Sequence, residues 1–414
     1  EVSSANPSHA FVLNLRLQCR AGAAERGKIV RGVLGKIYAY KALDDLILIY
    51  PLYAVMFVDH GVSPSQLALL FAVWSAVGLA LEVPSGVLAD HFSRKHLLAV
   101  GQLIRAAGYA CWLLFPGFWG YLAGFVLWGI KGALQSGTFE ALVYDELDRR
   151  GVADDFAKVI GRARAGGIVA ILVAMLAAAA VHSFGGYELL MLLSIAAVIA
   201  AAIVALALPS APRAQSTGET DYLSHLRRAL GETLRTPAIL RPMLVVVTLW
   251  TLGGSLDEFW GIYGEEAGLS REAIPIYYAA TYATSAVAAA LAYRLGGTPA
   301  AALYGVAILA GGLLIAAAQM MSPAGMLLLA VFAGLVKLID INFETRMQHA
   351  IPTERRATIA SLAGFLWTVG SIGLYLAFGQ IAERWSYAAA FMTFGVVMAL
   401  SGAAFLFSRA FRRI

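Results

Sequence analysis

Residues 85–98 read Ser-Gly-Val-Leu-Ala-Asp-His-Phe-Ser-Arg-Lys-His-Leu-Leu, a short polar stretch between two long apolar runs. An acid, Asp90, is followed closely by the basic pair Arg94 and Lys95. The apolar runs on either side are long enough to cross a lipid bilayer, which takes about 20 residues of helix. The stretch therefore indicates a tight polar connection between two membrane-spanning helices.

The composition of the whole chain agrees with a membrane protein. Of its 414 residues, 60% are hydrophobic and 14% are charged, and the mean hydropathy is +0.72. A soluble domain carries about 45–50% apolar and about 25% charged residues. Apolar runs of spanning length predict twelve helices, at 35–58, 64–86, 96–115, 118–141, 165–183, 187–208, 239–263, 272–294, 299–321, 324–343, 358–381 and 387–408.

The polar stretch resembles the G-x-L-A-D-R-x-G-R-[RK] loop of the major facilitator superfamily, which joins helices 2 and 3 on the cytoplasmic side. His91 stands where Arg is usual and Ser93 where Gly is usual, while the remaining positions match at Gly86, Leu88, Ala89, Asp90, Arg94 and Lys95. The resemblance implies an all-α membrane protein with 12 transmembrane helices in two pseudo-symmetric six-helix halves, similar to bacterial drug/proton antiporters. It also implies alternating access, with Gly86, Asp90, Arg94 and Lys95 as a gating loop.

The chain divides at its one long polar connection. We expect an N-terminal cytoplasmic tail at 1–32, a six-helix half at 33–208, a cytoplasmic linker at 209–236 and a second half at 237–414. Within the linker one helical face is apolar, which is typical of a helix lying on the membrane surface, with Leu223, Leu226, Leu230 and Leu234 on that face.

Internal similarity favours a duplication. Gly-Val-Ser at 61–63 recurs as Gly-Leu-Ser at 268–270, 207 residues later, and Lys131 recurs as Lys337, 206 residues later. Phe139-Glu140 recurs as Phe343-Glu344 at an offset of 204. A rival alignment pairs Asp44-Asp45 with Asp257-Glu258, but its offset of 213 disagrees with the others. We therefore place the first acidic pair in the cytoplasmic half of helix 1 and the second in the outer half of helix 7.

The distribution of Lys and Arg predicts the orientation. The outer loops hold only Arg271 and Arg384, whereas the other loops hold Arg94, Lys95, Arg149, Arg150, Lys158, Arg162, Arg164, Arg213, Arg227, Arg228, Arg235, Arg294, Arg355 and Arg356. We expect both termini to be cytoplasmic in a multi-pass protein of the bacterial inner membrane. This bias accounts for the net charge of +5 without a nucleic-acid partner.

Chemistry other than transport has little support in the sequence. Cys19 and Cys111 are the only cysteines, so neither a disulfide framework nor a zinc site is expected. We found no nucleophile–base pair, metal cluster or phosphate-binding glycine loop. We therefore expect no enzymatic activity and no cofactor, with the lipid bilayer and a small-molecule substrate as partners of a monomer.

Ionisable residues inside the membrane cost about 2.5–3.5 kcal/mol each on insertion scales and usually mark a pathway. They are concentrated on helices 1, 4, 7 and 10, the helices that line the central cavity in the superfamily. With three aromatic candidates, the predicted substrate and proton pathway comprises Asp44, Asp45, Tyr50, Trp128, Lys131, Glu140, Asp257, Glu258, Trp260, Lys337, Asp340 and Glu344.

Some roles stay open between mechanism and structure. One acid of each adjacent pair must point away from the cavity, because neighbours on a helix diverge by about 100°. Arg105 is expected to be a structural partner for an acid. Asp340 follows Lys337 by three residues and should neutralise it, whereas Lys131 must look across to helix 1 and is expected to be the free, switching charge.

The predicted function is proton-coupled export of small amphipathic compounds, cationic or zwitterionic, with the proton as coupling ion. Seven cavity-side acids against two lysines favour protons and a cationic cargo. The alternative is proton-coupled uptake of a polar metabolite such as an amino acid or a sugar acid. Helix 5, which begins Ala165-Gly-Gly-Ile, lacks the Gly-Pro motif that drug antiporters of the superfamily often carry.

Overall fold

The computed structural model describes residues 32–209, 230–231, 233–352 and 355–411, and in this part of the chain all regular structure is helical. We call residues 32–208 the N-terminal bundle and residues 230–411 the C-terminal bundle. After a helix at residues 32–45, the N-terminal bundle contains α2 (Tyr53–Asp59), α3 (Pro64–His91), α4 (Arg94–Leu114), α5 (Phe118–Gln135), α6 (Thr138–Arg149) and α7 (Phe156–Leu206). The C-terminal bundle contains α9 (Pro237–Leu249), α10 (Trp260–Glu266), α11 (Ala273–Leu291), α12 (Ala300–Met320), α13 (Pro323–Ala350), α14 (Arg356–Arg384) and α15 (Tyr387–Phe407).

Within the described residues, nine helical runs are long and apolar enough to cross a membrane. One of these runs contains α7, whose backbone is non-helical at Gly185 and Gly186, where the expected spans 165–183 and 187–208 meet. The predicted membrane architecture is confirmed at this coarse level, and the total of twelve spans stays a prediction. Leu223 and Leu226 of the expected surface helix lie outside the described residues, and Leu230 and Leu234 are exposed.

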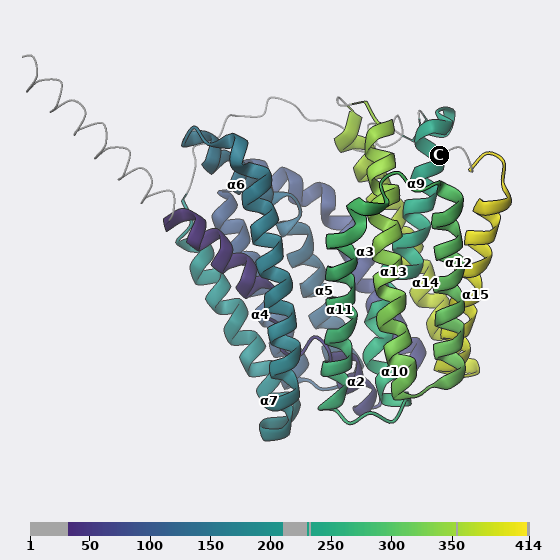
Figure 1. Ribbon diagram of the computed structural model, residues 1–414. Coiled ribbons are helices and arrows are strands. Elements are labelled where there is room, and N and C mark those ends of the chain that lie inside the picture. The colour runs from purple at the N-terminus through teal and green to yellow at the C-terminus, as the bar shows by residue number, and fades with distance from the viewer. Residues whose placement is uncertain (1–31, 210–229, 232, 353–354, 412–414) are drawn as a thin grey trace, which may run out of the picture.

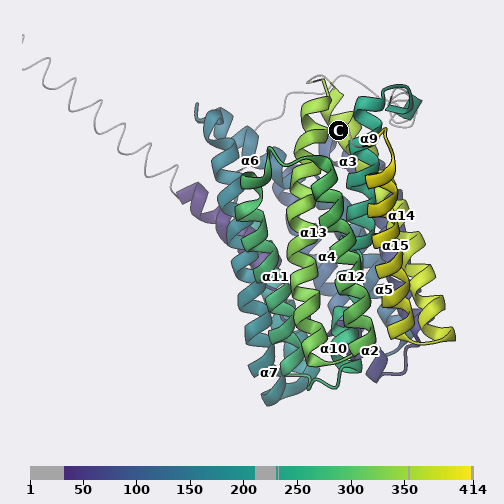
Figure 2. The same ribbon diagram turned by 45° about the vertical axis from the view of Figure 1, so that its right-hand side comes forward.

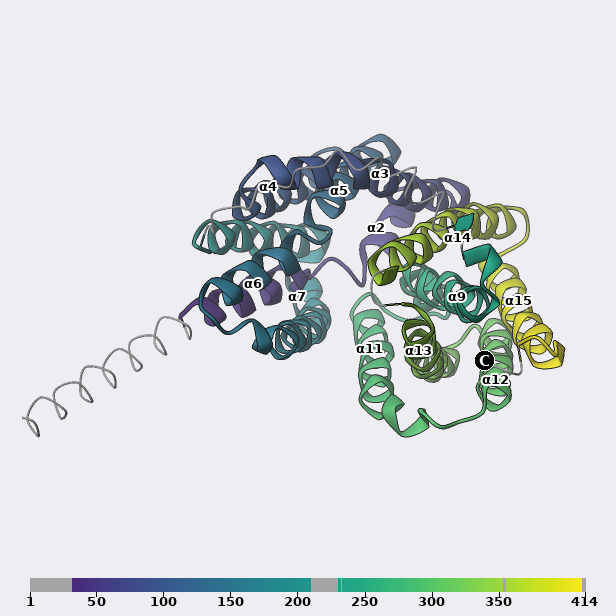
Figure 3. The same cartoon turned by 90° about the horizontal axis from the view of Figure 1, so that it is seen from above.

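The long helices run roughly side by side, as Figures 1 and 2 show from two directions. Seen from above in Figure 3, α4, α5, α6 and α7 form one group, and α9, α11, α12, α13 and α15 form another. The two bundles touch where α3 packs on α14 and where α7 packs on α11. We call the end that carries residues 59–64 and 267–272 the lower end, following Figure 1.

Two turns at the lower end have the same geometry 207 residues apart. Gly61 and Gly268 adopt left-handed backbone angles, with φ of +82° and +76°. The amide of each donates to the carbonyl three residues earlier at 2.9 Å. Two residues further on, the hydroxyls of Ser63 and Ser270 each accept from the backbone amide three residues later, at the start of α3 and α11. This matched geometry supports the expected duplication.

The first predicted span, 35–58, is not a continuous helix. Its helix ends at residue 45, residues 46–52 are irregular, and α2 continues to Asp59. Polar side chains satisfy the backbone of the interruption: Ser194 Oγ accepts from the amide of Ile49 at 3.1 Å, and Arg105 donates to the carbonyl of Asp44 at 2.9 Å. Non-helical backbone at membrane depth is tolerated where protein groups satisfy it in this way.

The seventh predicted span, 239–263, is interrupted at the corresponding place. After α9 come a π-helical turn, η2 (Trp250–Gly254), and a 3-10 turn, η3 (Leu256–Phe259), before α10 begins. The fourth span is also divided, because Gly137, with φ of +66°, separates α5 from α6. Glu140 therefore lies on α6 and not on the helix that carries Lys131, which corrects the prediction of one helix over 118–141.

Candidate functional site

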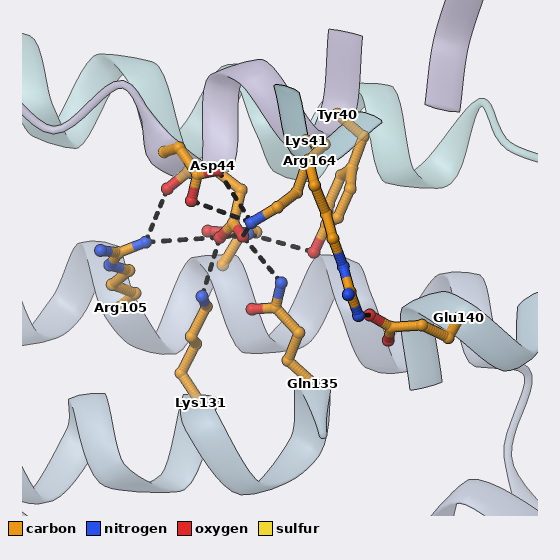
Figure 4. A network of polar contacts seen from close by, with 10 residues as sticks. Tyr40, Lys41, Asp44, Arg105, Lys131, Gln135, Glu140 and Arg164 are labelled. Carbon is orange, nitrogen blue, oxygen red and sulfur yellow. Dashed lines mark hydrogen bonds and ion pairs between the residues drawn. The ribbon is translucent and has the colours of Figure 1, made fainter. Parts of the chain in front are cut away.

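Asp44 is the centre of a polar network inside the N-terminal bundle (Figure 4). Its Oδ1 lies 2.8 Å from Lys131 Nζ on α5 and 3.3 Å from an Arg105 nitrogen on α4. The amide nitrogens of Gln102 and Gln135 each donate to the Asp44 carboxylate at 2.7 Å. Lys41 Nζ lies 3.5 Å from the other carboxylate oxygen, so this acid, which is 3% exposed, has three cations and two amides around it.

This geometry corrects the expectation that Lys131 is the free, switching charge. Lys131 does look across to helix 1, as predicted, but its ammonium group is paired with Asp44. Arg105 is a structural partner for an acid, as predicted, and it also binds the backbone carbonyl of Asp44. The network thus fastens residues 32–45 to α4 and α5.

The carboxylate of Asp45, the neighbour of Asp44, has a different nearest cation. It lies 2.8 Å from Lys41 Nζ and is only partly exposed. The backbone of α7 packs directly against this carboxylate at Gly167, where an added Cβ would overlap with it. Glu140, on α6, contacts Arg164 of α7 at 3.4 Å (Figure 4). The structure does not bring Glu140 into the Asp44 network.

Trp128 packs on aromatic and basic side chains within the N-terminal bundle. The guanidinium carbon of Arg105 sits 4.8 Å from the centre of its ring, a cation–π distance. Its ring also packs on Trp74, Trp112 and Phe125, with ring centres 5.6–5.9 Å apart. Trp128 therefore supports the position of Arg105, and it lines neither of the two cavities described below.

The second acidic pair lies in η3, at the boundary between the bundles. Glu258 accepts hydrogen bonds from two hydroxyls of the N-terminal bundle, those of Tyr53 on α2 and, at 3.5 Å, Tyr50. The backbone carbonyl of Asp257 accepts from the hydroxyl of Tyr278 at 2.6 Å. Within the described part of the chain neither acid forms an ion pair, although Glu258 is 7% exposed. This sets the pair apart from Asp44.

Two cavities lie on this boundary. The larger, of 360 Å³, is lined by Ile168 of the N-terminal bundle and otherwise by the C-terminal bundle, including Asp257, Trp260, Tyr282, Lys337 and Asp340. The smaller, of 180 Å³, is lined by Asp44, Asp45, Ile47, Tyr50, Arg105, Ile171, Met175 and Tyr282. Of the aromatic candidates, Trp260 and Tyr50 thus reach a cavity, one in each.

The charges predicted on the tenth span lie on α13 and are partly arranged as predicted. Lys337 Nζ lies 2.9 Å from Asp340 Oδ2, which confirms the expected neutralisation. Asp340 also accepts from the indole nitrogen of Trp250 at 2.5 Å. Glu344 lies on the same helix, α13, but does not line either cavity. Among the described residues, Asp257 is accordingly the acid of the larger cavity without a cation paired to it.

Polar contacts join the bundles at the lower end. Arg271 lies 2.6 Å from both Asp59 on α2 and Glu265 on α10. His182 at the lower part of α7 contacts Glu272 at 2.9 Å, and this hydrogen bond holds the pKa of Glu272 below its usual value. Ser65 of α3 donates its amide to Glu383 of α14 at 3.0 Å. These contacts close the lower end.

At the upper end, the polar stretch that opened the sequence forms the end of α3 and the start of α4. Arg94 pairs with Asp145 of α6 and donates to the carbonyl of Ala141 at 3.1 Å, all within the N-terminal bundle. The side chain of Asp90, the expected partner of Arg94, lies outside what the structure describes. Gly86 is exposed and has open space around its Cα, and Lys95 is half-buried.

Sequence reasoning missed several residues of these sites. Gln102 and Gln135 are amides within apolar spans, a signal for interhelical hydrogen bonding that could have marked them. Tyr53, Tyr278 and Tyr282 carry no comparable signal, because tyrosine is equally common as an anchor at the membrane surface.

The fold and the buried charges define a membrane transporter, and comparison with known proteins gives its family. The model of the Major Facilitator Superfamily matches residues 42–374. The chain therefore belongs to the Major Facilitator Superfamily.

Individual relatives are more distant. Multidrug resistance protein MdtH of Yersinia enterocolitica serotype O:8 / biotype 1B (strain NCTC 13174 / 8081) is 30% identical over 117 residues, which are 27% of this chain and 29% of that protein. A bacterial homolog of the human lysosomal transporter Spinster, solved in an inward-facing and unoccupied conformation, shares the fold with a TM-score of 0.73 at 19% identity, over 94% of this chain and 98% of that one. The nucleoside transporter NupG gives a TM-score of 0.70 at 15% identity, over 91% of this chain and 98% of that one.

Proposed function

We propose that this chain is a proton-coupled secondary transporter that exports small amphipathic cations or zwitterions by alternating access. The observation that carries the proposal is the Asp257–Glu258 pair at the boundary between the bundles, which has no ion pair among the described residues. Glu258 is buried, and the half-buried Asp257 faces the larger cavity. The other buried acids on the boundary already have cations beside them.

Electrostatics explains why this pair suits coupling. An isolated carboxylate is costly in a site of low dielectric and is neutralised by a proton or by a cation. Asp44 has Lys131 and Arg105, and Asp340 has Lys337, so neither depends on an incoming charge. At Asp257 a proton and a cationic cargo compete for the same carboxylate. Competition of this kind exchanges one for the other, which is antiport.

The walls of the larger cavity suit an amphipathic cation. Trp260 and Tyr282 offer aromatic faces, which attract cations such as quaternary ammonium groups. Gly253, Ala286, Ala289 and Val336 make the rest of the wall small and apolar. Small apolar cavities with a few placed polar groups are typical ligand sites.

The conformation and orientation are part of the proposal. The basic loops predicted to be cytoplasmic lie at the upper end, so the closed lower end would face outward. The protein would then be in an inward-facing state. Uptake of a polar metabolite remains the alternative, favoured by Lys337 and Ser285, which could bind polar groups of a substrate in the same cavity.

Transport in proteoliposomes tests both readings. The probe is benzyltrimethylammonium, a permanent cation that does not carry protons across lipid by itself. An antiporter accumulates it when the lumen is acid, whereas a symporter accumulates it when the outside is acid. We expect accumulation with an acid lumen. It should be lost in Asp257→Asn, which removes the carboxylate shared by the proton and the cargo, and in Glu258→Gln, in which downhill exchange should persist. Glu266→Gln, an exposed acid on the neighbouring α10, is the matched control. Unchanged accumulation in both amide variants contradicts the proposal.

A further inference from the structure

Tyr282 belongs to both cavities. It projects from α11 of the C-terminal bundle, yet it lines the smaller cavity together with residues that otherwise all come from the N-terminal bundle. It also lines the larger cavity, whose wall is mostly C-terminal. Asp257 lines the larger cavity with it, and Asp45 lines the smaller one with it. The Tyr282 side chain thus stands between the two spaces.

Neighbouring residues hold the ring in this place. Tyr282 stacks on Tyr278, with ring centres 6.0 Å apart and planes 24° apart. The hydroxyl of Tyr278 is in turn fixed by the carbonyl of Asp257 at 2.6 Å. Because the Tyr282 ring is held from one side in this way, it forms a wall with a defined position and does not rotate freely.

The two cavities offer different chemistry to a ligand. The larger contains Asp257, which has no ion-pair partner among the described residues. In the smaller, Asp44 is paired with Lys131 and Arg105, and Asp45 with Lys41, so both of its acids are compensated. Ile47, Ile171 and Met175 complete its wall and suit an uncharged tail.

We propose that Tyr282 sets the length limit of the cargo, as the wall between a cation subsite at Asp257 and an apolar subsite at Ile47, Ile171 and Met175. Short cations fit in the larger cavity alone. A longer apolar tail is excluded as long as the tyrosine ring separates the two spaces. This inference rests on the proposed function for the assignment of the larger cavity to a cation.

Equilibrium titration of the purified full-length protein in detergent tests the proposal, with no proton gradient present. The probes are benzyltrimethylammonium and 6-phenylhexyltrimethylammonium, which share the cationic group and the ring and differ in length. We expect the ratio of the Kd for the long cation to that for the short one to fall by about tenfold or more in Tyr282→Ala, the scale on which apolar pockets discriminate small differences in size.

Two variants serve as matched controls. Tyr282→Phe keeps the ring and should retain the ratio, and Tyr277→Ala removes a tyrosine of the same helix that lines neither cavity. Should Tyr282→Ala fail to fold, Tyr282→Leu makes the same comparison with a smaller loss of volume. An unchanged ratio in the shortened variants, an equal change in either control, or no binding of the short cation by the unaltered protein overturns the proposal.

The result is separable from the test of coupling. Loss of the length limit in Tyr282→Ala together with proton-independent flux rejects the proposed coupling and keeps this inference. Proton-driven accumulation with an unchanged Kd ratio supports the proposed coupling and rejects this inference.

Discussion

Lys131 Nζ and Asp44 Oδ1 lie 2.8 Å apart, although one belongs to α5 and the other to the end of the helix at residues 32–45. Both side chains are almost inaccessible, at 9% and 4% exposure. The pseudo-equivalent Lys337 also has an acidic partner, but its side chain is 45% exposed. The two lysines therefore differ in burial and not in whether they are paired.

This difference predicts unequal effects on stability. Lys131→Ala takes the nearest cation from the buried Asp44 carboxylate but leaves Arg105 beside it. The cost is therefore bounded by the about 3–5 kcal/mol for a buried charge that loses its partner altogether. Lys337→Ala breaks a pair within one helix whose acid, Asp340, is buried but whose lysine is 45% exposed. Water can take the place of the exposed ammonium group, so the cost should be smaller than at Lys131. We expect a clearly lower unfolding temperature for Lys131→Ala than for Lys337→Ala in the same detergent. Equal losses in the two variants would show that the buried network does not stabilise the bundle.

Close backbone packing at the lower end gives a second prediction. A Cβ on Gly379 of α14 would lie 3.0 Å from the carbonyl oxygen of Pro64 and closer still to the methyl group of Ala68. Gly379→Ala should therefore push α3 from α14 at a cost of about 1–3 kcal/mol, as is typical of overpacking. Hydrogen exchange of residues 61–68 should become faster. Gly373→Ala, on the same helix with open space around it, should leave exchange unchanged.

The tyrosines around Glu258 give a third prediction. Tyr53→Phe removes the closer of the two hydroxyls that hold this carboxylate across the boundary. Hydrogen bonds to charged groups are worth about 1.5–3 kcal/mol. We expect the variant to populate the state open at the lower end more often, measured as the distance between spin labels placed on the turns at 61 and 268. Tyr304→Phe, whose hydroxyl bond lies within the C-terminal bundle, is the control; an equal change in both variants would count against a special role for Tyr53.

The fourth prediction concerns pH at the lower end. His182 holds the pKa of Glu272 below its usual value, so the contact stabilises closure above the ordinary pKa of glutamate. That contribution is lost as the pH falls through the lowered pKa. Because Glu272 is largely exposed, the effect should be small. The distance between the same spin labels should increase at acid pH in the unaltered protein, and Glu272→Gln should remove this pH dependence.

The sequence was informative where local chemistry decides the backbone. The Gly-x-Ser match at 61–63 and 268–270 was used as a sign of duplication, and the two segments do form the same turn. A left-handed glycine followed by a serine that binds a backbone amide is a local arrangement, so it recurs where the residues recur. Lys337 forms an ion pair with Asp340 as expected, since residues three apart on a helix are neighbours.

The interruptions of the first and seventh spans were not predicted, although Pro51 and the pair Gly253-Gly254 mark them locally. Hydropathy records only how apolar a segment is, and residues 46–52 are as apolar as the helix around them. What permits the break lies far along the chain, in Ser194 and Arg105, which satisfy the freed backbone groups. The prediction that Lys131 is free was wrong for the same reason. The helix expected to lie opposite Lys131 was correct, but the short distance to Asp44 depends on where the helix at residues 32–45 ends.

The interruption at residues 46–52 gives α2 a position of its own. The helix before it is fastened to the N-terminal bundle through Asp44. Beyond it, α2 contacts the other bundle through Tyr53 and Asp59, and the carbonyl of Pro51 lies close against Gly261. The two bundles are therefore joined covalently by the linker and also through the non-covalent contacts of this short helix. Any motion that separates the bundles at the lower end must either extend residues 46–52 or break the contacts of α2 with the C-terminal bundle.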